Sequence, residues 1–135
     1  MAAQIRKELE VERRFAIFHQ KTEDELEKGI LMELSDAFDR ELAFERRVTA
    51  LETYLGIQYY LHLQRLGRAT DPQEENNEAE LVNRFSGVFS DSEHLWQYLY
   101  RYCGNSADEY FDRERIKESE NWSNLAGEIK RQLLR

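Results

Sequence analysis

The stretch that decides the fold is TEDELEKGILMELSDAFDRELAFERRVTALETYLGIQYYLHLQRLG, residues 22–67. It contains no proline, and its apolar residues recur every three or four positions, as on one face of an α-helix. As one helix these residues would measure about 69 Å, whereas a compact chain of this length is about 35–40 Å across. We therefore expect the segment to break, or to protrude and lay its apolar face on another molecule.

The expected break lies between Gly29 and the pair Ser35 and Asp36, because these residue types disfavour a helix interior. One long helix would then cover residues 36–66 and end at Gly67. Such a helix would still measure about 46 Å, which exceeds the expected diameter of the molecule.

Capping patterns place the neighbouring helix starts. Thr22 and Glu25 have the spacing of a capping box, which separates a first helix over 4–20 from the segment 22–67. Asp71 before Pro72 is a typical cap followed by proline at the first helical position, and predicts a helix over 72–85.

The alternative for this region is an acidic linker over 68–80. Its sequence, DPQEENNEAE from residue 71 onward, offers almost nothing to bury. Composition alone does not decide between a helix over 72–85 and an acidic linker over 68–80.

Residues 94–103, HLWQYLYRYC, fit either a strand or a helix, since aromatic residues favour strands. We favour a helix, because Ser90 and Glu93 form a capping box before it and Gly104 is a natural stop. Further helices are expected over 107–119 and 123–134.

Together these patterns predict an all-α fold, either a helical bundle or an elongated helical assembly, with one long central helix. The chain is expected to form a single domain over 1–135. It comprises N-terminal helices at 4–20 and 22–67, the linker at 68–80 and C-terminal helices within 81–135. Six glycines and one proline are few for a fold rich in strands and tight turns.

The charge balance argues against a nucleic-acid ligand. The net charge is −8, of which residues 1–70 contribute −2 (11 basic, 13 acidic) and residues 71–135 contribute −6 (8 basic, 14 acidic). A phosphate-binding surface needs the opposite sign. An acidic protein that mimics nucleic acid for a basic partner is one alternative function.

Location is expected to be cytoplasmic and away from membranes. Cys103 is the only cysteine, so no intramolecular disulfide can form, which favours a reducing compartment. The first residues lack the apolar core of a signal peptide, and no apolar run is long enough to span a bilayer.

The segment Glu10-Val11-Glu12-Arg13-Arg14-Phe15 resembles the opening motif of the triphosphate-tunnel (CYTH) enzymes. In that family alternating glutamates on a strand bind the metal that holds a triphosphate, so the resemblance implies a barrel lined by charged strands. The sequence departs from the pattern, because Arg14 replaces a typical lysine and the downstream segments read as helices.

Arg14 and His19, spaced as Arg-x4-His, resemble the motif of the HEPN ribonucleases, which are all-helical and often dimeric. The resemblance implies that both side chains act on the scissile phosphate of an RNA. The motif stands earlier in this chain than is usual in that family, and the chain lacks a basic surface.

No cofactor or metal site is expected. The three histidines, His19, His62 and His94, have no ligand at a diagnostic spacing, and the Glu-x-x-His pair of di-iron bundles is missing. His62 is expected to be a hydrogen-bonded core or interface residue, and Cys103 a buried thiol.

The remaining signal is aromatic. Tyrosine and tryptophan are enriched at binding hot spots, and the chain groups them in two segments. The predicted interface residues are Tyr54, Tyr59, Tyr60, His62, Trp96, Tyr98, Tyr100 and Tyr102.

We therefore expect a non-enzymatic protein-binding or adaptor protein, with a partner protein as ligand. The apolar residues of segment 54–61 cover more than half of the helix circumference. The long helix is thus either central in the fold or shared with a second chain. We expect a homodimer whose interface uses residues 36–66.

Overall fold

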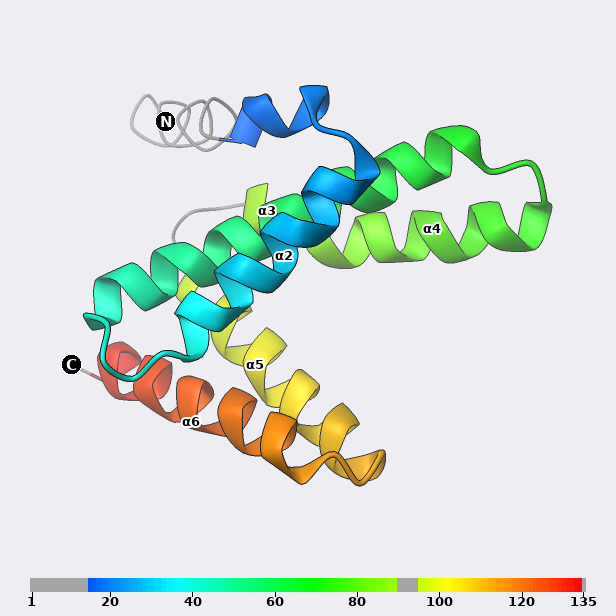
Figure 1. Cartoon of the computed structure of the whole chain (residues 1–135). Coiled ribbons are helices and arrows are strands. Elements are labelled where there is room, and N and C mark those ends of the chain that lie inside the picture. Colours follow the sequence, from blue (N-terminus) through cyan, green and yellow to red (C-terminus); the bar gives the residue numbers. More distant parts are fainter. Residues whose placement is uncertain (1–14, 90–94, 135) are drawn as a thin grey trace, which may run out of the picture.

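In the computed structural model, which describes residues 15–89 and 95–134, all regular structure is helical and no strand occurs within those ranges (Figure 1). The elements are η1 (Ala16–Gln20), α2 (Glu23–Phe38), α3 (Phe44–Arg68), α4 (Pro72–Phe85), η2 (Ser86–Phe89), α5 (Leu95–Asp112) and α6 (Ile116–Leu133), where η denotes a short 3-10 helix. The prediction of an all-α fold with one long helix is confirmed.

Helix α3 is central and, with 25 residues, measures about 37 Å. Helix α2 packs along it, and α4 turns back to form a hairpin with its C-terminal half (Figure 1). Helices α5 and α6 form a second hairpin, which meets α2 and α3 through the buried ring of Trp122. The two hairpins diverge from this junction (Figure 1).

The first predicted break is wrong. Helix α2 runs through Gly29, Ser35 and Asp36 and ends only at Phe38. A Cβ on Gly29 would lie 3.1 Å from Cδ1 of Ile57, so this glycine lets α2 pack closely on α3 instead of ending the helix.

The chain turns at residues 39–43 instead, where Asp39 Oδ1 accepts a hydrogen bond of 3.0 Å from the Glu41 amide. A short polar side chain that bonds the backbone two residues on is a typical turn device. Helix α3 then continues through Gly67, the expected stop, to Arg68.

The C-terminal half also contains fewer and longer helices than predicted. Residues 95–103 are helical, as expected, but α5 continues through Gly104 to Asp112, and α6 begins at Ile116. Cys103 and Ala107 are both buried on either side of Gly104, so packing keeps the helix intact. The turn comes at Glu114, whose φ of 63° is left-handed.

Two of the predicted caps are confirmed, and the capping box predicted at Ser90 and Glu93 lies outside the described residues. Thr22 and Glu25 form both bonds of the capping box, and the Asp71 carboxylate accepts a bond of 3.0 Å from the Gln73 amide. Helix α4 has the bounds predicted for 72–85, so the alternative acidic linker over 68–80 shrinks to residues 69–71. The N-terminal helix over 4–20 lies mostly outside the described residues, and its end forms η1.

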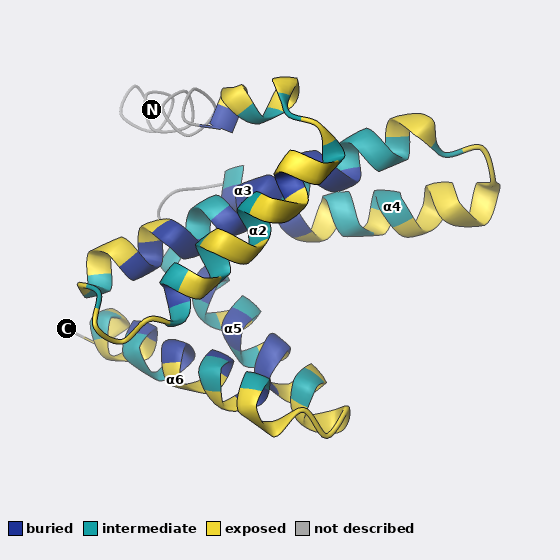
Figure 2. Cartoon of the chain, viewed as in Figure 1, coloured by how far each residue is buried: buried dark blue, intermediate teal, exposed yellow. Residues whose placement is uncertain are grey.

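The core lies where the hairpins meet α2 (Figure 2). Fully buried side chains from α3, α5 and α6 fill it, among them Leu51, Leu55, Leu99, Trp122 and Ile129. None of the helices described is long and apolar enough to cross a membrane.

Candidate binding cleft

The aromatic residues of α3 are mostly inside the monomer. Tyr54, Tyr60 and His62 are only 7%, 6% and 8% exposed, so they do not form the surface predicted for them. The sequence predicted that α3 would bury one face, but α2 and α4 both pack along it and η2 contacts it as well. Helix α3 is therefore central in the fold, and its apolar circumference does not need a second chain.

Tyr54 anchors a polar contact within this core. Its hydroxyl lies 3.3 Å from that of Tyr102 and accepts a bond of 3.2 Å from Gln58 Nε2. Burial raises the pKa of Tyr54 and raises that of Tyr102 well above its usual value. Both phenols therefore stay neutral and join α3 to α5.

His62 is the hydrogen-bonded core residue that its pattern predicted. Its Nδ1 lies 2.7 Å from Glu78 Oε2, and its ring stacks on Phe85 at 5.7 Å between centroids. Both partners belong to α4. These contacts join α3 to α4, and they engage both Nδ1 and one face of the imidazole ring.

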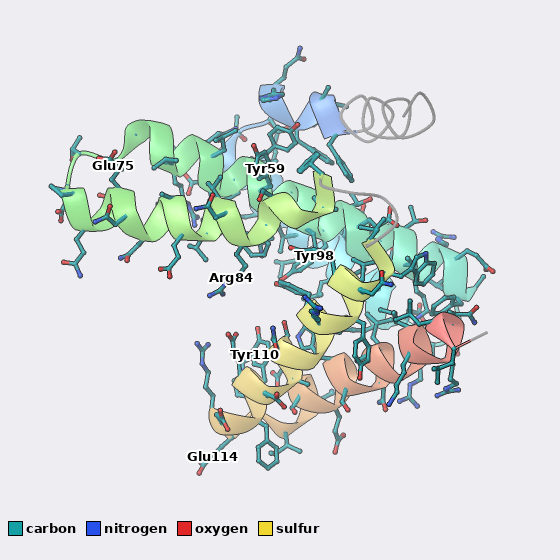
Figure 3. All side chains as sticks on the ribbon, turned by 180° about the vertical axis from the view of Figure 1, so that it is seen from behind. Tyr59, Glu75, Arg84, Tyr98, Tyr110 and Glu114 are labelled. Carbon is teal, nitrogen blue, oxygen red and sulfur yellow. The ribbon has the colours of Figure 1, made fainter. Side chains whose placement is uncertain are left out.

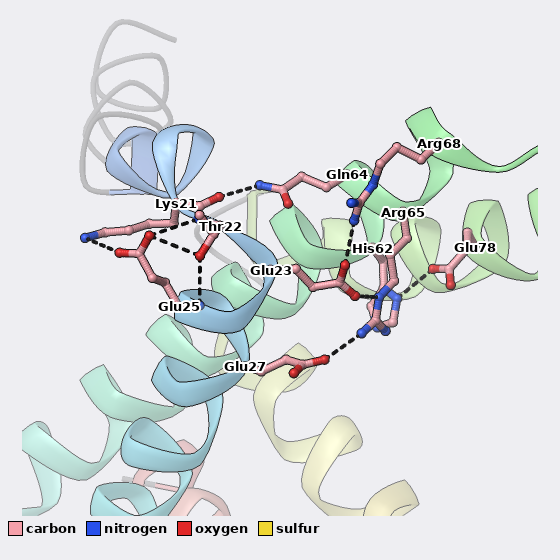
Figure 4. A network of polar contacts seen from close by, with 10 residues as sticks. All are labelled: Lys21, Thr22, Glu23, Glu25, Glu27, His62, Gln64, Arg65, Arg68 and Glu78. Atoms are coloured by element: carbon pink, nitrogen blue, oxygen red, sulfur yellow. Dashed lines mark hydrogen bonds and ion pairs between the residues drawn. The ribbon is translucent and has the colours of Figure 1, made fainter.

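A larger polar network surrounds this pair (Figure 4). Glu23 at the start of α2 accepts bonds of 2.6 Å from Arg65 Nε and from Arg68 Nη2 at the end of α3. Arg65 also donates to Glu27 at 2.8 Å. These charges already neutralise one another, so the network joins two helices and offers little to a ligand.

The other predicted interface residues are half-buried and dispersed. Trp96 stacks on Phe44 at 5.9 Å, Tyr59 lies 4.8 Å from the ring of Phe89, and Tyr100 packs against the core. The predicted interface residues meet in two cavities: Tyr59 and Tyr60 line a small one beside His19 and Phe89, and Tyr98 and Tyr102 line the one that also gathers charged side chains.

The cavity lined by Tyr98 and Tyr102 is a cleft of about 490 Å³ between α4 and α5. Arg84 extends into it from α4, and Tyr98 lies at the inner end of α5 (Figure 3). The rest of the lining comes from one face of α5, namely Arg101, Tyr102, Asn105, Ser106, Asp108, Glu109 and Asp112.

The cleft has opposite charges at its two ends. Arg84 and Arg101 lie at the inner end, and the carboxylates of Asp108, Glu109 and Asp112 follow toward the tip of α5. Within 15–89 and 95–134, none of these five side chains makes an ion pair. They are therefore free to pair with a ligand.

Tyr98 closes the inner end of the cleft. Its hydroxyl donates a bond of 2.6 Å to the Arg84 carbonyl, and burial raises its pKa to about 12. A Cβ on Gly87 would lie 2.3 Å from the Tyr98 ring, so a glycine at this position is what lets the ring reach α4.

Sequence reasoning missed the charged residues of the cleft. The signal was present, because residues 98, 101, 105, 108 and 112 are spaced by three and four along one helix face. The sequence analysis ended one helix at Gly104 and began the next at residue 107, which divided this row in two. Arg84 comes from another helix and has no local signal.

Most residues of the two enzyme resemblances lie outside the part of the chain that the structure describes. Arg14 and the motif from Glu10 lie outside the described residues, so the ribonuclease and triphosphate readings remain predictions. His19 is exposed on η1, with its ring 4.4 Å from that of Tyr60. Burial raises the pKa of Cys103 to about 12, which keeps it a thiol rather than a nucleophilic thiolate.

In the part of the chain that the structure describes, no three His, Cys, Asp or Glu side chains gather as metal ligands. Comparison of the chain with known protein families, with characterised proteins and with solved structures finds no match. The cleft between α4 and α5 is thus the candidate site, on the strength of its geometry and charge.

Proposed function

We propose that this protein is a non-enzymatic binding protein that seats a helical segment of a partner protein in the cleft between α4 and α5. The observation that carries the proposal is the set of unpaired charges along the cleft, basic at one end and acidic at the other. Grooves between helices are a common docking place for a further helix.

The floor of the cleft suits a protein ligand. Tyr98 and Tyr102 present aromatic surface with neutral hydroxyls, and Asn105 adds an amide that can donate and accept. Aromatic anchors within a polar rim are typical of protein interfaces.

The spacing along α5 defines the partner. Arg101 and Asp112 are eleven residues apart, which is about 16 Å along a helix. A complementary helix would carry acidic side chains at one end and basic side chains about three turns away. The acidic end of the partner helix would meet the two arginines. Whether that end is its N-terminus or its C-terminus decides whether the partner runs parallel or antiparallel to α5.

A displayed library of helix-forming peptides tests the proposal. We expect selection on the full-length protein to enrich peptides with acidic and basic clusters about eleven residues apart. Binding should weaken about tenfold or more in Arg101→Glu, because each reversed contact becomes repulsive.

Arg131→Glu is the matched control, since Arg131 is exposed on α6 and away from the cleft. It should leave peptide affinity unchanged. Selection on the Arg101→Glu variant should return peptides whose acidic cluster is replaced by basic residues. If no peptides are enriched, or the enriched ones bind equally well to wild type and Arg101→Glu, the proposal is wrong.

A further inference from the structure

Helix α2 has an apolar outer face that none of the described elements covers. Leu31 and Met32 are 70% and 69% exposed, while Leu26 and Ala37 on the opposite side are buried. Leu31, Met32, Ser35 and Asp36 line a shallow hollow of about 350 Å³. Two adjacent large apolar residues at such exposure, beside a hollow, are typical of an interaction site.

The charges around this face are arranged symmetrically about Met32. Lys28 lies four residues before it and Asp36 four residues after it, each about 6 Å away along the helix axis. Neither makes an ion pair within the described ranges. An antiparallel copy of α2, related by a twofold axis at Met32, would place Lys28 of each chain opposite Asp36 of the other.

We propose that a second copy of this chain docks on this face, so that the protein is a homodimer joined by two antiparallel α2 helices. Such an interface is isologous, with the same patch on both subunits. Met32 meets its own counterpart at the axis, Leu31 enters the hollow of the partner, and the small Ser35 lets the helices approach.

Charge favours a second copy over an unrelated partner. The charges of this face one turn before and one turn after Met32, Lys28 and Asp36, are opposite in sign and equally distant from it, so they complement a second copy in the antiparallel arrangement. The interface differs from the one expected from sequence, because α3 is covered and α2 provides the surface. Helix α2 lies in front of α3 in Figure 1, whereas α4 and α5 come forward in the reverse view of Figure 3, so the dimer leaves the cleft open.

Sedimentation equilibrium of the full chain over a range of concentrations tests the dimer. We expect a species of twice the 16.2 kDa chain mass at high concentration. Lys28→Asp and Asp36→Lys should each raise the dimer dissociation constant about tenfold or more, because each creates two like-charge contacts. The double variant Lys28→Asp/Asp36→Lys should restore the wild-type dissociation constant.

Phe111→Lys is the matched control, since Phe111 is 62% exposed at the end of α5 and is as apolar as Met32. Met32→Lys should abolish the dimer and Phe111→Lys should not, while circular dichroism shows unchanged helix content in both. A monomeric wild type would overturn the proposal. So would a dimer that the two single reversals leave intact, or one that the double variant fails to restore.

Discussion

The guanidinium of Arg47 on α3 is buried, at 4% side-chain exposure, and is bonded on two sides. Its Nε donates to the Ala37 carbonyl of α2 at 2.9 Å, and its Nη1 pairs with the Glu128 carboxylate of α6. One side chain thus connects three helices at the point where the α5–α6 hairpin meets the rest of the molecule. A buried cation is tolerated only when it is paired in this way.

Glu128→Ala should therefore lower the free energy of unfolding by about 3 kcal/mol, because it leaves the Arg47 charge buried without its partner. Urea unfolding followed by circular dichroism measures the change. Glu120→Ala, at an exposed position of the same helix, should change stability by less than about 0.5 kcal/mol. Equal losses in the two variants would contradict the role given to the ion pair.

Two glycines allow opposite predictions for the same substitution. Gly104 lies inside α5, and a Cβ there would meet no atom within 4 Å apart from its chain neighbours and the backbone of its own helix. Gly104→Ala should raise the free energy of unfolding by about 0.5–1 kcal/mol, since alanine loses less conformational freedom in a helix. The same urea titration measures the gain.

Gly87→Ala should do the reverse, with a loss of about 1–3 kcal/mol, because the new Cβ would lie 2.3 Å from the Tyr98 ring. Displacement of that ring would also disturb the inner end of the cleft. A stabilised Gly87→Ala variant would show that Tyr98 does not lie against η2 as described.

The sequence predicted correctly those helix starts that depend on neighbouring residues alone. The caps at Thr22 and Asp71 each depend on side chains within three residues, and both start their helices where expected. Gly29 and Gly104 were wrongly predicted to interrupt their helices, because whether a glycine ends a helix depends on contacts with residues far away in the sequence. Gly29 packs on Ile57, and Gly104 sits between residues that α6 helps to bury, so tertiary packing outweighs a propensity cost of about 1 kcal/mol.

The candidate site was less accessible to prediction for the same reason. Tyr98 and Tyr102 were singled out for being aromatic, but aromatic character does not distinguish a cleft from a core, and Tyr54 and Tyr60 are core. The approach of Arg84 to α5 depends on the turn after α4. No spacing within a single helix encodes that arrangement.

The α2–α3 network should make stability depend on acidic pH. Hydrogen bonds from Arg65 and then Arg68 lower the pKa of Glu23 below its ordinary value of 4.5. A carboxyl whose pKa falls on folding stabilises the folded state above that ordinary value and loses the effect as pH falls through its folded-state pKa. Glu23→Gln should therefore lower the melting temperature at pH 7, and the difference from wild type should shrink below pH 4.5.

Asp24→Asn separates this effect from that of the helix dipole. Asp24 is exposed in the same first turn of α2 and has no arginine partner among the described residues. Asp24→Asn should lower the melting temperature at neutral pH by less than Glu23→Gln does. If both variants show the same melting temperature at every pH, the arginine contacts contribute nothing.

Tyr98 should give stability the opposite dependence at alkaline pH. Burial raises its pKa from the ordinary 10 to about 12, so the folded state holds the neutral phenol more tightly than the unfolded chain does. That preference is fully present below pH 10 and is lost as pH rises toward 12.

Tyr98→Phe removes the bond to the Arg84 carbonyl and should cost about 1 kcal/mol at pH 7. It should also lose stability less steeply than wild type above pH 10, as urea midpoints measured across the alkaline range would show. Parallel curves for the two proteins would mean that the Tyr98 hydroxyl ionises as readily in the folded protein as in the unfolded chain.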